Sequence, residues 1–498
     1  MDFLSGLATV FQAGNLLLLV LGVILGIVVG AIPGLTATLA ISLLLPFTFG
    51  LDASTALIML VGIYVGGIYG GSITAILLRT PGTPGAAATA LDGYPLTLKG
   101  QGGRALGIAT AASFTGGIIS AAFMIFLSPA ISSFALKFSS AEFFALAFFG
   151  LTIIFSVSGG SLLKGAIAGC IGLLINTVGF DRIVAYPRFT FGSRNLLVGF
   201  PLLPSIIGLF AISEVLRLFL ADPRKKDEAP LKVGRILPRW PDILHLKWIF
   251  LKSSVIGTFI GALPGAGANI ASFVSYNEAK RSSKTPEEFG KGIIDGVAAS
   301  EASNNAVTGG ALIPMLTLGV PGDSVTAVLL GALTIQGLQP GPLLFRDNPD
   351  VVNAIFAGII VANVVMLLSG ITLSTIFARI ATIKKTTLAP IIAIFSLIGA
   401  FAGEGSFWHM TIAAAFGIGG YFLEKNHFPL APIALAIVLG SLAESNFRTA
   451  LIRANGSPLI FFSSPISVFF LAVAIGSIFF SLRKQRKARP GKGRSEVA

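Results

Sequence analysis

The chain is a succession of long apolar segments separated by short polar or Gly/Pro-containing ones. Many of these segments approach or exceed the roughly 20 residues that a helix needs to cross a bilayer. Only 11% of the 498 residues are charged, whereas soluble domains carry about 25% charged residues. So few charged side chains cannot cover a water-facing surface. The sequence therefore predicts an all-α polytopic membrane protein, and it excludes a soluble enzyme, a nucleic-acid binder and a disordered chain.

Some apolar segments are too short to cross a membrane alone, namely 35–50, 323–338, 408–423 and 429–443. Short apolar segments bounded by Gly and Pro are typical of broken helices and re-entrant hairpins. We therefore expect about 10–13 spans, counted by the length rule, together with broken helices or re-entrant hairpins.

Most of the net charge of +13 is concentrated in two short segments. Residues 221–247 hold seven Lys/Arg and four Asp/Glu, and residues 483–498 hold seven Lys/Arg and one Glu. Basic residues beside apolar spans favour the cytoplasmic side of the membrane. We therefore expect a cytoplasmic connector and a cytoplasmic tail rather than nucleic-acid binding. Binding of the tail to lipid headgroups is the lesser alternative.

Three pairs of motifs recur in the same order in the two halves of the chain. The segment GIVVGAIPG at 26–34 matches GTFIGALPG at 257–265. Each half then carries a Gly-Gly pair followed by Pro-Gly, and later FPLLP or FPLAP followed by a glutamate. Equivalent loops differ in charge: residues 48–55 have no Lys or Arg, whereas 276–292 have four. This difference is expected if the two halves insert in opposite senses.

The repeat and the charge pattern together predict two inverted-topology repeats. The predicted organisation is a first transmembrane repeat at 1–220, a basic cytoplasmic connector at 221–246, a second transmembrane repeat at 247–482 and a basic cytoplasmic tail at 483–498.

A Pro-Gly dipeptide interrupts an apolar segment in each repeat, at 33–34 and at 264–265. Proline removes a backbone donor and glycine permits left-handed dihedral angles, so each helix is predicted to break there. Unpaired backbone groups at membrane depth are tolerated only beside protein or a water-filled cavity. Small oxygen-bearing side chains follow each break, which favours a solute or ion site over a kinked packing helix.

A second Pro-Gly turn in each repeat precedes a predicted helix. Thr83 is expected to cap a helix that starts at Pro84. Because helix N-termini offer free N–H groups and a partial positive charge, they suit a carboxylate. The candidate substrate-binding residues are therefore Pro33, Gly34, Thr36, Thr38, Thr80, Gly82, Thr83, Gly265, Asn269, Asn304, Asn305, Pro321, Gly322, Asp323 and Ser324.

The segment EASNNAVTGG at 301–310 is the most polar one flanked by membrane-like sequence. Hydrogen bonding between helices is the alternative explanation, but intramembrane polar residues tend to be functional. The candidate Na⁺ ligands are Ser303, Asn304, Asn305, Thr308 and Gly309. If the coupling ion is H⁺ instead, Glu301, Asp295 and Asp323 are the candidate carriers. Arg79 either faces the site or extends to the headgroups from a helix end.

Signals for catalysis are weak. The three histidines are scattered, Cys170 is the single cysteine, and no phosphate-binding loop for ATP is present in the sequence. We expect no catalytic residues, no metal other than the candidate Na⁺, and no cofactor.

Four segments carry a family resemblance: GAIPGLTATLAISLLLPFTFGL at 30–51, GGIYGGSITAILLRTPGTPGAAATALDGYPL at 66–96, YPRFTFG at 186–192 and SEASNNAVTGGALIPMLTLGVPG at 300–322. They closely resemble the large membrane subunit, or permease, of the tripartite tricarboxylate transporters, over about Gly26 to Glu444. The resemblance implies a secondary transporter of the bacterial inner membrane that works with a small membrane subunit and a periplasmic solute-binding protein. It also implies uptake of citrate or another organic carboxylate, coupled to a cation, usually Na⁺.

Inverted repeats with broken helices favour alternating access around a site near the bilayer midplane. The two alternatives are a membrane-embedded enzyme, which would need a clustered acid/base or metal set, and a passive anion channel.

Overall fold

The structure, a computed structural model, describes residues 2–157, 161–181, 183–220, 236–265, 267–380, 385–402 and 405–488. These residues are mainly helical, and the strands among them form one short antiparallel hairpin. Residues 221–235 of the predicted connector and 489–498 of the predicted tail lie outside the described residues. The prediction of an all-α polytopic membrane protein is confirmed.

Among the described residues, 7 helices are long and apolar enough to cross a membrane. They are Ala13–Ala31, Ala53–Leu78, Gly102–Ala135, Leu202–Phe219, Trp240–Gly261, Pro349–Ile380 and Ala431–Arg453. Shorter apolar helices lie at Ala37–Thr48, Ser140–Ile153, Leu162–Asn176, Ser324–Ile335, Thr387–Ala402 and Pro465–Phe479. Long and short apolar helices thus coexist, and the number of full crossings stays a prediction.

The chain forms two compact units, and each contains segments from both halves of the sequence. Unit 1 comprises Met1–Leu136 and Pro201–Leu423, and unit 2 comprises Lys137–Phe200 and Glu424–Ala498.

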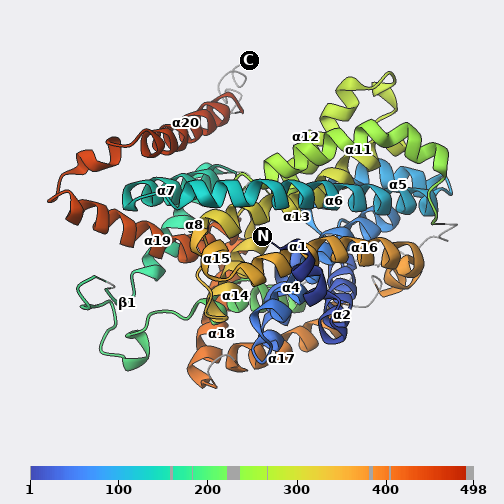
Figure 1. The fold of residues 1–498 in the computed structure, drawn as a ribbon. Coiled ribbons are helices and arrows are strands. Elements are labelled where there is room, and N and C mark those ends of the chain that lie inside the picture. The colour runs from blue at the N-terminus through green and yellow to red at the C-terminus, as the bar shows by residue number, and fades with distance from the viewer. Residues whose placement is uncertain are drawn as a thin grey trace, which may run out of the picture. The chain divides into compact units, whose positions relative to one another are not determined.

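Unit 1 is a helical bundle (Figure 1). Its elements are α1 (Phe3–Val10), α2 (Ala13–Ala31), α3 (Ala37–Leu44), η1 (Leu45–Thr48), α4 (Ala53–Leu78), η2 (Pro84–Ala87), α5 (Ala90–Leu98), α6 (Gly102–Ala135), α9 (Leu202–Ile207), η4 (Gly208–Ile212), α10 (Ser213–Phe219), α11 (Trp240–Gly261), α12 (Gly267–Ser282), η5 (Pro286–Glu288), α13 (Ile294–Leu318), α14 (Ser324–Ile335), α15 (Pro342–Asp347), α16 (Pro349–Ile380), α17 (Lys385–Ala402) and most of α18 (Phe407–Lys425).

Equivalent elements of the two halves pack in equivalent ways within unit 1. Helix α2 packs on α4, and its counterpart α11 packs on α13. Helix α6 of the first half packs on α13 of the second, while α16 of the second half packs on α4 of the first. The two buried helices α4 and α13 are therefore each held by both halves.

Glycines allow the backbones of these paired helices to approach each other closely. A β-carbon on Gly26 of α2 would lie 2.8 Å from the backbone nitrogen of Gly67 in α4. In the second half, a β-carbon on Gly257 of α11 would lie 2.8 Å from the Cα of Ser303 in α13. Small residues at these positions let the backbones touch, as is usual where helices pack inside a membrane.

Both predicted helix breaks are present. Helix α2 ends at Ala31, Gly34 has a φ of +95°, and α3 starts at Ala37 after the cap at Thr36. Helix α11 ends at Gly261, Gly265 has a φ of +78°, and α12 follows from Gly267. A positive φ at this point suits glycine because it has no β-carbon to clash with the backbone.

Unit 2 comprises α7 (Ser140–Val157), α8 (Leu162–Asn176), β1 (Gly179–Phe180), β2 (Pro187–Arg188), η3 (Arg194–Leu196), α19 (Ala431–Arg453), η6 (Pro458–Phe462) and α20 (Pro465–Ala488). Helix α7 packs against α19 and α20, and α8 packs against α19. Phe144, Phe447 and Phe461 meet with ring centroids 4.8–5.2 Å apart. The contacts among these three rings join α7 to α19 and η6.

Candidate functional site

The turn before α14 touches both helix breaks, the one at 33–34 and the one at 264–265. The backbone N–H of Gly265, at the second break, donates to the carbonyl oxygen of Gly322 at 2.7 Å. Two residues further on, the hydroxyl of Ser324 lies 2.8 Å from that of Thr38, which is in the first turn of α3. Residues 322–324 therefore connect the two breaks, because Gly322 contacts the second break and Ser324 contacts the helix that follows the first.

Asp323 caps helix α14 with its own carboxylate. Its Oδ1 accepts from the backbone N–H of Thr326 at 2.8 Å, and the Thr326 hydroxyl accepts in return from the backbone N–H of Asp323. The other oxygen, Oδ2, accepts from the Tyr64 hydroxyl of α4 at 2.7 Å. Because a carboxylate already faces the positive end of α14, this terminus offers a substrate less compensation than the sequence suggested.

The matching turn in the first half of the chain differs from the expected capped helix. Thr83 stands before Pro84 as predicted, but its side chain makes no capping hydrogen bond, and the next element is the single 3₁₀ turn η2. Thr83 Oγ1 is instead buried against Gly71 of α4 and has no hydrogen-bond partner. A four-residue turn aligns few peptide dipoles, so it cannot act as the predicted helix N-terminus for an anion.

Glu301 lies at the centre of a polar cluster inside unit 1. Glu301 belongs to α13, and its side chain is wholly buried. Oε1 accepts from the Thr89 hydroxyl at 2.5 Å, and Oε2 accepts from the Ser113 hydroxyl of α6 at 3.1 Å. Asn304 Nδ2 lies 3.5 Å from Oε1. Among the described residues, no Lys, Arg or His is recorded in an ion pair with this carboxylate.

Two side-chain oxygens near Glu301 lack donors. Asn305 donates from Nδ2 to Ser113 at 2.8 Å, but its Oδ1 and the Oδ1 of Asn304 have no hydrogen-bond partner although both residues are wholly buried. The Asn304 oxygen sits against Gly85, where a β-carbon would collide with it. Buried acceptors without donors are rare in folded proteins, so this cluster has spare capacity for a cation.

The helical period separates the predicted Na⁺ ligands. Glu301, Asn304 and Asn305 are spaced three and four apart and share a face of α13. The carbonyl and Cα of Ser303 instead lie against Gly257 of α11, and Gly309 packs on Ser120 of α6. Thr308 Oγ1 donates to the carbonyl of Asn305 at 2.7 Å. The structure therefore brings Asn304 and Asn305 to Glu301, but it places Ser303 and Gly309 in helix packing.

Several predicted residues lie away from this cluster. Thr80 and Asn269 are exposed. Arg79 ends α4 in the left-handed conformation, with an exposed side chain whose guanidinium lies 5.9 Å from the Tyr94 ring centroid. This geometry matches a helix-end arginine rather than one that faces Glu301. Asp295 lies 3.4 Å from His245, near the start of α13.

An arginine that the sequence analysis missed reaches the first break. Arg217 Nη2 donates to the carbonyl oxygen of Gly34 at 3.2 Å and to Glu214 Oε1 at 2.6 Å. Gly82 lies on the other side of this break, against the carbonyl of Gly30. The first break is therefore held between α10 and its own Pro-Gly turn.

Thr89, Ser113 and Tyr64 were also missed. Thr89 is 212 positions from Glu301 in the sequence and Ser113 is 188 positions away. No local motif marks either residue, because only the packing of α5, α6 and α13 brings them together.

A family model described as "Tripartite tricarboxylate transporter TctA family" matches residues 16–435, which is most of the chain. The chain belongs to this family. The membership makes it the large membrane subunit of a tricarboxylate transporter, and the family is one of transporters. A tripartite system implies partner subunits and a periplasmic binding protein.

Two relatives come from Agrobacterium vitis. The "Uncharacterized 52.8 kDa protein in TAR-I ttuC' 3'region" is 36% identical over 501 residues, which cover 99% of both chains. The "Uncharacterized protein in TAR-II ttuC' 3'region" is 35% identical over 226 residues, which cover 45% of the present chain and 93% of that relative. No solved structure matches the chain.

Proposed function

We propose that this chain conducts organic carboxylates, tricarboxylates among them, into the cell as the large subunit of a secondary, cation-coupled importer. A periplasmic solute-binding protein delivers the substrate and a small membrane subunit completes the complex. The chain resides in the bacterial inner membrane with its basic connector and tail in the cytoplasm. Family membership supports the transport role, and the basic segments support the orientation.

The observation that carries the coupling proposal is the environment of Glu301. Burying a carboxylate without a counter-charge costs several kcal/mol even after relaxation. Thr89 and Ser113 donate hydrogen bonds to this carboxylate, but hydroxyls bring no net positive charge. A cation or a proton must therefore accompany Glu301 when it is enclosed.

Na⁺ suits this cluster better than H⁺. A proton on Glu301 would add a single O–H donor, which can satisfy at most one of the two donor-less oxygens of Asn304 and Asn305. A hard cation binds several oxygens at once, and carboxylate and amide oxygens are the ligands that hard cations prefer. Glu301, Asn304 and Asn305, with the Thr89 and Ser113 hydroxyls, form the proposed Na⁺ site.

The proposed substrate site lies at the two breaks and the turns that contact them. The contact of Thr38 with Ser324 and the contact of Gly265 with Gly322 join elements of both repeats. Motion of one repeat against the other would open and close these contacts, as alternating access requires. Asn304 is next to Gly85 of the first turn, so cation binding and the arrangement of that turn are coupled sterically.

Reconstituted uptake tests this function. Proteoliposomes holding both membrane subunits, supplied with the binding protein and radiolabelled citrate or another carboxylate, should accumulate substrate when an inward Na⁺ gradient is imposed. Equal accumulation with a pH gradient in Na⁺-free buffer would move the coupling to H⁺. Uptake that needs neither a gradient nor the binding protein would indicate a passive channel, and chemical conversion of the substrate would indicate a membrane-embedded enzyme.

A further inference from the structure

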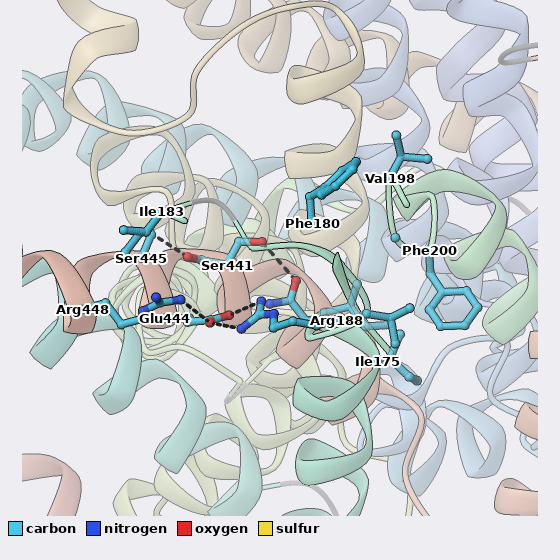
Figure 2. Close-up of a pocket in the computed structure, with 14 residues that line it drawn as sticks. Ile175, Phe180, Ile183, Arg188, Val198, Phe200, Ser441, Glu444, Ser445 and Arg448 are labelled. Atoms are coloured by element: carbon cyan, nitrogen blue, oxygen red, sulfur yellow. Dashed lines mark hydrogen bonds and ion pairs between the residues drawn. The ribbon is translucent and has the colours of Figure 1, made fainter. Parts of the chain in front are cut away.

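Unit 2 contains a cavity that the central cluster does not involve. Its volume is about 110 Å³, and it is lined by α8, α19 and the loop between α8 and α9. Figure 2 shows Glu444 of α19 between two arginines, Arg188 from β2 and Arg448 from α19. Arg188 belongs to the YPRFTFG segment, which the proposed transport site leaves without a role.

The four charged side chains beside the cavity are joined to one another by hydrogen bonds and ion pairs. Arg188 holds both oxygens of Glu444, with Nη1 2.5 Å from Oε1 and Nη2 3.2 Å from Oε2. Arg448 Nη1 donates to Asp181 Oδ2 and lies 3.5 Å from Glu444 Oε1. Two arginines therefore face two carboxylates, and the formal charge of the group is zero.

Hydrogen-bonding capacity in this group is unbalanced in spite of the neutral charge. The second Asp181 oxygen already accepts the backbone N–H groups of Ile183 and Val184 at 2.8 and 3.0 Å. Arg188 Nε, by contrast, is buried without an acceptor. Arg448 is bound through Nη1 alone among the hydrogen bonds of the described residues, which leaves Nε and Nη2 as donors. Each carboxylate is engaged by an arginine, whereas Arg188 Nε and two nitrogens of Arg448 have no acceptor among the described residues, so the guanidiniums keep unused donors.

The rest of the lining suits a small amphipathic anion. Ser441 and Ser445 of α19 add hydroxyl groups, and Ser441 Oγ lies 3.0 Å from the Asn176 amide. Apolar side chains such as Phe180 and Ile437 supply the other walls. A water position needs about 10–15 Å³ on this measure, so the cavity has room for roughly seven to eleven non-hydrogen atoms. That is the size of a four-carbon dicarboxylate.

The position along α19 indicates which side of the membrane the cavity serves. Arg448 and Glu444 lie five and nine residues before the end of α19 at Arg453, or about 8 and 14 Å at 1.5 Å per residue. From that end, η6 and α20 lead to the basic tail. If the tail is cytoplasmic and α20 crosses the membrane once, the Arg453 end of α19 faces the periplasm.

We propose that the unit 2 cavity is a second carboxylate-binding site, where the guanidinium groups of Arg448 and Arg188 take up a small organic carboxylate on the periplasmic side. The inference rests on the proposed function for its substrate class and for the side of the membrane. The site would hold an incoming carboxylate near the surface, apart from the cluster around Glu301. The bound carboxylate supplies the acceptor that Nε and Nη2 of Arg448 lack.

Equilibrium binding to the full chain in lipid nanodiscs tests this site. The probes are radiolabelled succinate and radiolabelled citrate at constant ionic strength. Ser445→Leu fills the cavity and keeps all four charged groups, while Arg448→Gln removes the donors. Arg194→Gln is the matched control, because Arg194 is an exposed arginine of the same loop that does not line the cavity.

Wild type and Arg194→Gln should each bind one more succinate per chain than Ser445→Leu does. Arg448→Gln should bind succinate at the unit 2 cavity at least tenfold more weakly than wild type. Citrate, being larger, should compete poorly at this site. Equal succinate binding by wild type, Ser445→Leu and Arg448→Gln would overturn the proposal, and so would failure of wild type to bind either probe. Asn304→Ala separates the two proposals: if it transports normally while Ser445→Leu loses a binding site, the central site fails and the unit 2 site stands.

Discussion

The Thr89 hydroxyl donates a 2.5 Å hydrogen bond to the carboxylate of Glu301, a residue 212 positions away in the sequence. Both side chains are wholly buried. The contact ties the start of α5 to α13, the helix that carries the polar cluster, and it orients a carboxylate that has no basic partner among the described residues. Cation coupling in this account depends on that carboxylate.

Thr89→Val should weaken cation affinity while Thr89→Ser should preserve it. Valine has the shape of threonine but cannot donate, and a hydrogen bond to a charged group contributes about 1.5–3 kcal/mol, or roughly ten- to hundredfold in affinity. The measurement is the Na⁺ concentration that gives half-maximal uptake in proteoliposomes. An unchanged Na⁺ dependence in Thr89→Val would show that Thr89 does not position Glu301 for the ion.

Asp323→Ala should destabilise the protein by about 0.5–2 kcal/mol, the usual cost of losing an N-cap, because the Asp323 carboxylate caps α14. Asp323→Asn should retain most of this stability and support uptake, since asparagine also caps helices well. Thermal unfolding in detergent and uptake together check the prediction. A stable but inactive Asp323→Asn variant would instead indicate that Asp323 exchanges a proton during transport.

Gly66→Ala should destabilise unit 1 by about 1–3 kcal/mol through overpacking, because a β-carbon there would lie 3.0 Å from the backbone nitrogen of Ile27 and collide with the carbonyl of Val23. Gly14→Ala is the control: nothing lies within 4 Å of a β-carbon at Gly14, and alanine in a helix is favoured over glycine by roughly 0.5–1 kcal/mol. Denaturant titration of the two variants compares them. Equal stability would contradict the close α2–α4 packing.

The loop of unit 2 that follows α8 and contains Asp181 should keep its structure in moderate acid. A hydrogen bond from Arg448 and the N–H groups of Val184 and Ile183 hold the pKa of Asp181 well below its usual range. A lowered folded-state pKa stabilises the fold above the unfolded-state value of about 3.9, and this contribution is lost as pH falls through the folded-state pKa. Hydrogen exchange at Ile183 and Val184, corrected for the intrinsic effect of pH, should therefore be equal at about pH 7 and pH 5 and faster only below the ordinary Asp pKa.

Asp181→Asn provides the control for that measurement. It should expose the amides of Ile183 and Val184 to fast exchange at neutral pH, because the neutral amide binds Arg448 less strongly than the carboxylate does. Fast exchange in the wild type at pH 5 would contradict the assigned ion pair.

Local features of the fold could be predicted from the sequence. The break at Pro33-Gly34 follows from two residues whose backbone preferences oppose a helix, and its copy at 264–265 follows from the repeat. Asp323 is a favoured N-cap residue, so its capping of α14 is also a local signal, although the sequence pattern predicts that this helix terminus binds a substrate. In these cases the deciding interactions lie within a few residues.

The candidate site could be predicted only in part. Asn304 and Asn305 can be predicted because polar residues stand out in an apolar segment, whereas the sequence indicates Glu301 only as a candidate proton carrier. Their partners Thr89 and Ser113 come from other helices and have no local signal. Ser303 and Gly309 were included because sequence proximity does not reveal that neighbouring positions on a helix face different elements.

The most direct test of the cation-coupling account is the binding of ²²Na⁺ to the purified chain. Wild type and Glu287→Gln, a substitution in the loop before α13, should bind Na⁺ saturably, whereas Glu301→Gln should lose that binding while staying folded. Na⁺ binding by Glu301→Gln equal to that of wild type would contradict the central claim.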